Sequence, residues 1–244
     1  MEAFLAENIT SWSSSLDGSE KLNFRGFGLN ALFTLRRTPL HLPFLHAAAR
    51  FWNPVTHIFS FVGQEVCPTF EDFQVSMESE CFEVIVPQLR FGHAQALGRM
   101  RGLTTHDARA LICNGELDIL SVSHRFSDAG DRSNHYWQGF RRHALCLCLL
   151  SHFLLSSGFG GASIRLIEVA QGLREGKSCI AMTLAETLMG LDSVYRREAT
   201  RFAGSPQLLQ VMFPTQPYIY ICSHHSTLRL GFSHKTLVLL FSHR

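Results

Sequence analysis

Apolar residues recur at intervals of three and four along most of the chain, and this spacing predicts helices. The segment over about residues 135–156 is apolar on nearly all sides, which is typical of a helix buried in the middle of a bundle. Ser205-Pro206 is a helix start signal, with serine at the N-cap and proline in the first turn. The predicted helices cover approximately residues 29–36, 43–51, 70–77, 105–113, 116–126, 135–156, 164–173, 179–188, 193–202 and 206–212.

Short extended runs interrupt this pattern. Residues 57–62 and 65–67 flank a turn that contains Gly63, which favours a β-hairpin. Thr69 and Asp72 then form a capping box that begins the helix at residue 70. Residues 81–86 are a further candidate strand, ended by Pro87. The predicted fold class is therefore mainly α, a multi-helix single domain with one small β-hairpin.

Three segments differ in composition. Residues 1–22 are rich in Ser, Asp and Glu and predict a flexible N-terminal lead-in, whereas residues 23–213 form the helical domain. Residues 214–244 have Ser-His pairs but no coherent periodicity, so we expect an atypical, poorly ordered tail. We interpret this tail as a truncated or mistranslated end rather than a metal site, because no helix or hairpin brings its histidines together.

Composition excludes several classes of protein. The chain of 244 residues has 46% apolar residues and a formal net charge of +2, so it can bury a core and has no overall drive toward nucleic acid or membrane. The longest apolar stretch, residues 145–155, is too short to span a bilayer, for which about 18 residues are needed. The seven cysteines are odd in number and no signal peptide precedes them, so we expect reduced thiols and an intracellular location.

Motifs that would carry chemistry are incomplete. Gly176-Lys177-Ser178 ends like a phosphate-binding loop, but Gln171 stands where the required first glycine belongs. No zinc-binding or serine-nucleophile motif occurs, and a cysteine nucleophile, Cys67 or Cys81 with His57, stays an open alternative. We predict no catalytic residue, no metal and no cofactor, and therefore no enzyme.

Arginine and aromatic residues alternate in two places. Arg141 and Arg142 follow Trp137 and Phe140, and Arg196 and Arg197 follow Tyr195. Such clusters can stack bases and pair with phosphates, so these four arginines are the candidate nucleic-acid contacts. The favoured alternative is an amphipathic helix with arginines at its rim.

The segment over residues 29–77 contains several sequence features in a defined order. These are Phe51-Trp52, the apolar hairpin, Glu65, Pro68-Thr69 and Glu71-Asp72. With the later segments AETLMGLDSVYRRE and SPQLLQV, it resembles the plant mobile domain, also called the aminotransferase-like plant mobile domain, and its retrotransposon-associated relatives of unknown function. The resemblance covers approximately residues 23–212.

This resemblance implies a biological context. It implies a transposon-derived plant protein located in the nucleus, with protein or chromatin partners. The label "aminotransferase-like" implies no activity here, because pyridoxal phosphate chemistry needs a Schiff-base lysine and only Lys177 lies inside the domain, without a supporting partner. We expect a non-enzymatic helical interaction module. The alternatives are a nucleic-acid-binding module that uses the arginine–aromatic clusters and an enzyme with a dispersed site.

Overall fold

The fold is mainly α, as predicted. The computed structural model describes residues 2–35, 38–61, 64–81, 83–86, 92–101, 103–127, 135–157, 162–199, 202–215, 219–220, 227–233 and 236–242. The α-helices are α1 (Glu2–Ser15), α2 (Gly18–Asn23), α3 (Leu32–Leu35), α4 (Leu42–Ala49), α5 (Phe70–Ser76), α6 (His93–Arg101), α7 (Thr105–Ala110), α8 (Ile119–Ser127), α9 (His135–Leu149), α10 (Leu166–Arg174), α11 (Ile180–Tyr195) and α12 (Pro206–Thr215). A 3-10 helix η1 (Phe24–Phe27) and a π-helix η2 (Leu150–Leu154) complete the helical part.

Three small sheets accompany the helices. Their strands are β1 (Trp52–Asn53), β2 (Ile58–Phe61), β3 (Gln64–Val66), β4 (Ile112–Cys113), β5 (Glu116–Leu117), β6 (Ala162–Ser163), β7 (Ile219–Tyr220), β8 (Thr227–Ser233) and β9 (Thr236–Ser242). The first two sheets, β1-β2-β3 and β4-β5-β6, are antiparallel throughout. The third, β7-β9-β8, contains one parallel pair.

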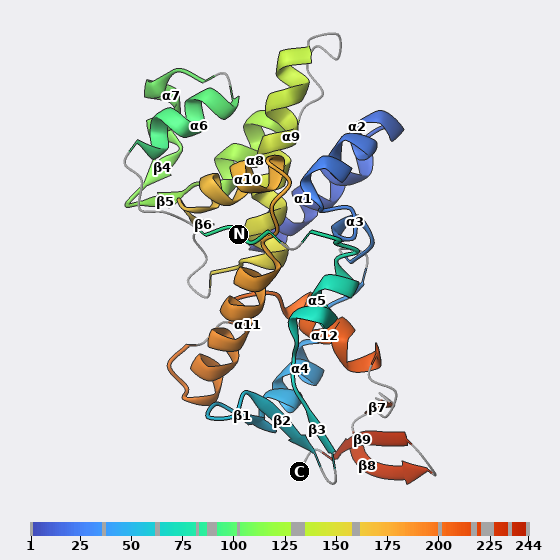
Figure 1. Ribbon diagram of the computed structural model, residues 1–244. Coiled ribbons are helices and arrows are strands. Elements are labelled where there is room, and N and C mark those ends of the chain that lie inside the picture. Colours follow the sequence, from blue (N-terminus) through green and yellow to red (C-terminus); the bar gives the residue numbers. More distant parts are fainter. Residues whose placement is uncertain are drawn as a thin grey trace.

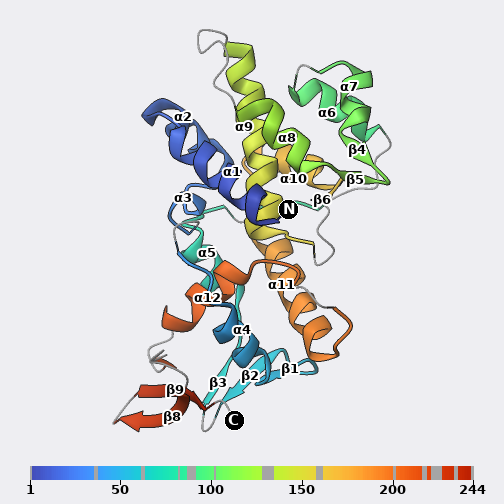
Figure 2. The same ribbon diagram turned by 180° about the vertical axis from the view of Figure 1, so that it is seen from behind.

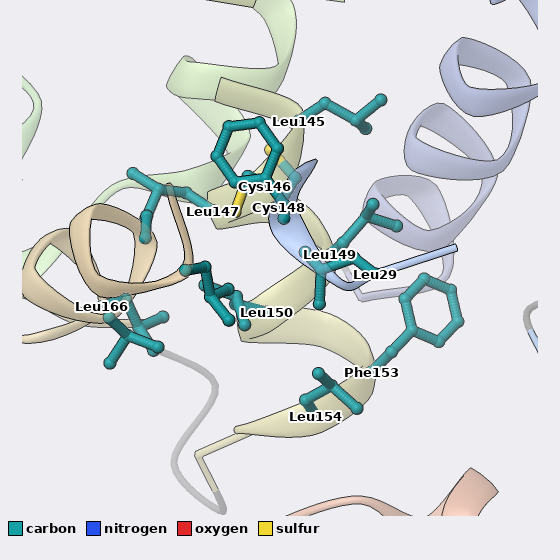
Figure 3. Close-up of a cluster of buried hydrophobic side chains, with 14 of the residues drawn as sticks. Leu29, Leu145, Cys146, Leu147, Cys148, Leu149, Leu150, Phe153, Leu154 and Leu166 are labelled. Atoms are coloured by element: carbon teal, nitrogen blue, oxygen red, sulfur yellow. The ribbon is translucent and has the colours of Figure 1, made fainter. Parts of the chain in front are cut away.

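The larger hydrophobic core surrounds α9, as the all-round apolar pattern predicted. Every side chain from Ala144 to Leu150 is fully buried. Helices α1, α6, α8 and α10 pack against α9 in the upper half of the molecule (Figures 1 and 2). Figure 3 shows the side chains of this segment pointing outward on all sides of the helix, with Leu29 and Leu166 closing around it.

The predicted flexible lead-in over residues 1–22 is wrong. Residues 2–15 and 18–23 are helical, and Ile9, Trp12 and Leu16 are buried in the larger core. These positions are three and four residues apart, so they form one apolar stripe along α1 that packs on α8 and α9. The Ser-rich composition hid this stripe, and the N-terminal segment belongs to the folded unit.

A second core, which we call the aromatic core, lies in the lower half of the molecule and contains the buried rings of Phe44, Trp52, Phe59, Phe61 and Phe213. The predicted β-hairpin is confirmed as β2 and β3, with Ser60 opposite Glu65; its turn at residues 62–63 lies outside the described part. Phe59 packs against Trp52 and Phe213, with ring centroids 4.8 and 5.0 Å apart. The indole Nε1 of Trp52 donates to Asp192 Oδ1 at 2.8 Å, which ties the sheet to α11.

Several other predictions need correction. The predicted helices over 179–188 and 193–202 are one helix, α11, which ends at Tyr195 and is followed by Arg197 at a left-handed φ of 59°. The candidate strand over 81–86 reduces to a single bridge between Val84 and Ser178. The helix predicted from residue 116 begins at Ile119, because residues 116–117 belong to β5. Strands β7, β8 and β9 lie where a poorly ordered tail was predicted, and the side chains there are outside the described part.

Helices α11 and α12 connect the two cores. On α12, Leu208 packs into the larger core, and its neighbour Leu209 packs into the aromatic core. The segment before α12 crosses α11 at very short range: an added Cβ on Gly190 would lie 2.2 Å from the Ala203 carbonyl oxygen, and one on Gly204 would lie 2.5 Å from the Thr187 Cα. We call this crossing the glycine joint.

Alanine at the joint will destabilise the protein. Gly204 has a φ of +90°, and Gly204→Ala adds both backbone strain and a clash with α11. We expect a loss of roughly 3 kcal/mol or more in the free energy of unfolding, measured by urea titration. Gly18→Ala is the matched control, since its Cβ meets nothing within 4 Å, and it will stay within about 1 kcal/mol of wild type. Equal stabilities of the two variants would contradict the close crossing.

Candidate functional site

Arg141, a candidate nucleic-acid contact, is an internal structural residue. Its side chain is 4% exposed, and Nη1 donates to Glu20 Oε1 at 2.8 Å. Nε and Nη2 donate to the carbonyl oxygens of Phe126 and Ser127 at 3.1 and 3.2 Å. Arg141 therefore ties α2, the end of α8 and α9 together, and its guanidinium does not face solvent.

The other three candidate arginines do not converge with it. Arg142 is half-buried on α9, and Arg196 and Arg197 are exposed directly after α11. Helix α9 lies in the upper half of Figure 1, and the C-terminal end of α11 lies in the lower half. The four arginines predicted to contact nucleic acid thus form no common surface.

Removal of Arg141 will test its structural role. Arg141→Ala leaves the Glu20 carboxylate buried without its partner, and we expect a loss of about 3–5 kcal/mol in the free energy of unfolding. Arg142→Ala, on the same helix, will change stability by less than about 1 kcal/mol. Chemical denaturation of both variants measures the difference, and a stable Arg141→Ala protein would refute this assignment.

The Gly176-Lys177-Ser178 segment lies beside a cavity of about 300 Å³ between η1 and the start of α11. Lys177 Nζ is 3.2 Å from Glu175 Oε2 and 3.6 Å from Glu83 Oε1. A hydrogen bond to Glu175, and the charges of both carboxylates, raise the pKa of Lys177 above its ordinary value. A Schiff-base lysine needs a lowered pKa, so this environment acts against such chemistry.

The open alternative of a cysteine nucleophile activated by His57 is not supported by the geometry. His57 Nε2 lies 3.4 Å from Asp192 Oδ2, and its ring stacks on Trp52. Cys81 Sγ donates instead to the Gly176 carbonyl oxygen at 2.7 Å, and Cys67 Sγ to the Pro68 carbonyl oxygen at 3.6 Å. In the described part of the chain, no three His, Cys, Asp or Glu residues are grouped so that they would hold a metal ion.

Thiol reactivity follows burial. Complete burial raises the pKa of Cys179 to about 11, so it carries almost no thiolate at neutral pH. Partial burial, and then the charge of Asp72, also raise the pKa of Cys67, so its alkylation will continue to increase at pH values where a free thiol is already fully reactive.

We expect iodoacetamide to label Cys67 and Cys113 in the native protein and to leave Cys146, Cys148 and Cys179 unmodified until urea is added. Peptide mass spectrometry measures this pattern, and rapid native labelling of Cys179 would contradict it.

A half-open cleft of about 890 Å³ lies between the two cores, and we call it the groove. Its walls come from α4, the β5–α8 segment, the end of η2, α11 and α12. The described residues that line it are mainly apolar: Leu40, Leu42, Leu45, Ala49, Leu117, Ile119, Leu120, Ala162, Leu191, Val194, Ala199, Phe202, Pro206 and Leu209. Their chain positions run from 40 to 209, so only the tertiary fold assembles the groove.

The π-helix η2 and the glycine joint shape one end of the groove. Ser151 and His152 on η2 line it, and π-helical turns occur frequently at functional sites. Ser205 Oγ donates to the Phe153 carbonyl oxygen at 2.6 Å, and the backbones of Ser156 and Gly204 bond to each other. These contacts hold η2 against the start of α12.

The polar lining of the groove is acidic. Its described lining contains Glu116 and Asp118 but no Lys or Arg, and the remaining polar groups are His, Ser and Gln. Glu116 is exposed on β5, whereas Asp118 accepts hydrogen bonds from the Ser121 backbone at 3.0 Å and caps α8. The groove is thus an apolar surface with carboxylates on one side, and sequence reasoning did not identify it.

Comparisons with known proteins add no assignment to this geometry. No family model, no curated protein and no solved structure matches the chain. Among the helices that the structure describes, none has the length and apolarity to cross a membrane.

Proposed function

We propose that this protein is a non-enzymatic helical interaction module that binds a protein partner in the groove between its two cores. The observation that carries this proposal is the groove itself, since its described lining is mainly apolar. Contiguous apolar surface rimmed by polar residues marks interaction sites on soluble proteins. Leu42, at the groove, keeps 53% of its surface exposed, so a partner would bury apolar area there.

The biological context in this proposal rests on the resemblance to the plant mobile domain. We propose a transposon-derived plant protein that acts in the nucleus with protein or chromatin partners. Two residues that carry this resemblance form hydrogen bonds within the fold. Trp52 on β1 binds Asp192 of α11, and Thr69 caps α5 through its bonds with Asp72. We therefore propose a packing role for Trp52 and Thr69.

The nucleic-acid alternative has less support. Arg141 forms a buried ion pair with Glu20. Arg142 lies on α9, whereas Arg196 and Arg197 follow α11. An enzyme with a dispersed site also has less support, because the described groove lining contains no cysteine.

Site-specific photo-crosslinking tests the proposed function. A benzoylphenylalanine placed at Leu42 in the full chain will crosslink discrete proteins in nuclease-treated plant nuclear extract. The same residue at Val55, which is 87% exposed and outside the groove lining, is the matched control and will not crosslink them.

A variant with a filled groove sharpens this experiment. Filling the groove with Ala49→Trp will remove the crosslinks at Leu42, provided that circular dichroism shows a folded chain. Identical crosslinks at Leu42 and Val55, or crosslinks that vanish on nuclease treatment, would contradict a protein-binding groove.

A further inference from the structure

We infer that the occupant of the groove is the apolar face of a short amphipathic helix that carries a Lys or Arg beside that face. This inference rests on the proposed function and names the chemistry of the partner. Two properties of the groove point to it, namely the sign of its charge and the state of its backbone groups.

The described residues of the groove carry acidic side chains without Lys or Arg. Glu116 and Asp118 are the acidic side chains of this described lining. Glu116 is exposed and makes no ion pair with any described residue, so its charge is available to a partner. Charged groups beside an apolar contact select partners of opposite sign and suppress those of like sign. A cationic residue is therefore favoured next to the apolar face of the occupant.

The backbone of the groove favours a helical occupant over an extended one. Strand β5 is the central strand of its sheet, so β4 and β6 already pair with both of its edges. Strand β6 has only two residues and offers little edge for another strand. An extended peptide would bury unpaired amides against apolar side chains, whereas a helix satisfies its own backbone groups. Helices α4, α11 and α12 supply the complementary walls.

Of the two acidic residues, Glu116 can be substituted with less effect on folding. Asp118 also caps α8 through the Ser121 amide and hydroxyl, so its removal would affect folding. Asn caps helices as well as Asp does, so Asp118→Asn removes the charge and keeps the cap. Glu65→Gln is the matched control, because Glu65 is likewise an exposed strand glutamate and does not line the groove.

Phage display with the full chain as bait tests the inference. The library consists of amphipathic helices of roughly four turns, with fixed leucines on one face and randomised residues elsewhere. Binders are counter-selected against the Leu42→Asp variant, whose exposed position leaves folding intact. We expect enrichment of Lys or Arg at a fixed offset from the leucines. Affinity, measured by fluorescence anisotropy, will fall about threefold to tenfold with Glu116→Gln and further with Asp118→Asn, and will not change with Glu65→Gln.

The outcomes separate the inference from the proposed function. Groove-dependent binders without enrichment of basic residues, or with affinities unchanged by Glu116→Gln and Asp118→Asn, would overturn the inference and leave the proposed function standing. If the counter-selection removes every enriched helix, binding lies outside the groove, and both the inference and the proposed function are overturned. Basic binders that weaken with Glu116→Gln and with added salt support the inference.

Discussion

The close crossing of Gly204 over α11 is the contact on which the rest of the structure depends. The core around α9 and the aromatic core meet where Thr187 and Gly190 approach the segment before α12. A Cβ atom at Gly190 or Gly204 would hold the two backbones apart. Glycine allows contact, and the hydroxyl of Thr187 accepts the Ser205 amide at 3.0 Å inside the joint. The groove between the cores follows from this arrangement, because α11 and α12 span both.

The function proposed for this geometry is recognition. Polar side chains that suggested chemistry have structural roles: Arg141 neutralises a buried carboxylate, Asp192 binds Trp52, and Lys177 pairs with surface glutamates. The groove, by contrast, is lined mainly by apolar side chains, several of which belong to the two cores, together with the exposed carboxylate of Glu116. Apolar surface left open between two cores is suited to burial by another molecule.

Local signals in the sequence predicted local structure well. The capping box at Thr69 and Asp72 forms both of its reciprocal bonds, and the hairpin and the buried helix α9 lie where the periodicity placed them. The failures have tertiary causes. Gly190 lies inside one continuous helix because Ala203 packs against it, a contact that no short window of sequence contains. Likewise, the apolar stripe along α1 gives only a weak signal in the sequence, because its burial comes from contacts with α8 and α9.

The candidate site was less predictable than the fold. The arginine–aromatic clusters gave a sequence signal, but the fold buries Arg141 and separates the others. The groove gave no signal, because its lining comes from separate segments and each contributes ordinary apolar residues. Its acidic side depends on Glu116, whose exposure is set by the sheet that β5 forms with β4 and β6.

The central claim is that a partner binds between the two cores, and hydrogen exchange tests it most directly. Exchange should be followed by mass spectrometry on the full chain, alone and with its tightest-binding helical peptide. The account predicts slower exchange in α4 (Leu42–Ala49) and η2 (Leu150–Leu154), with α6 (His93–Arg101) unchanged. Protection confined to α6 would contradict it.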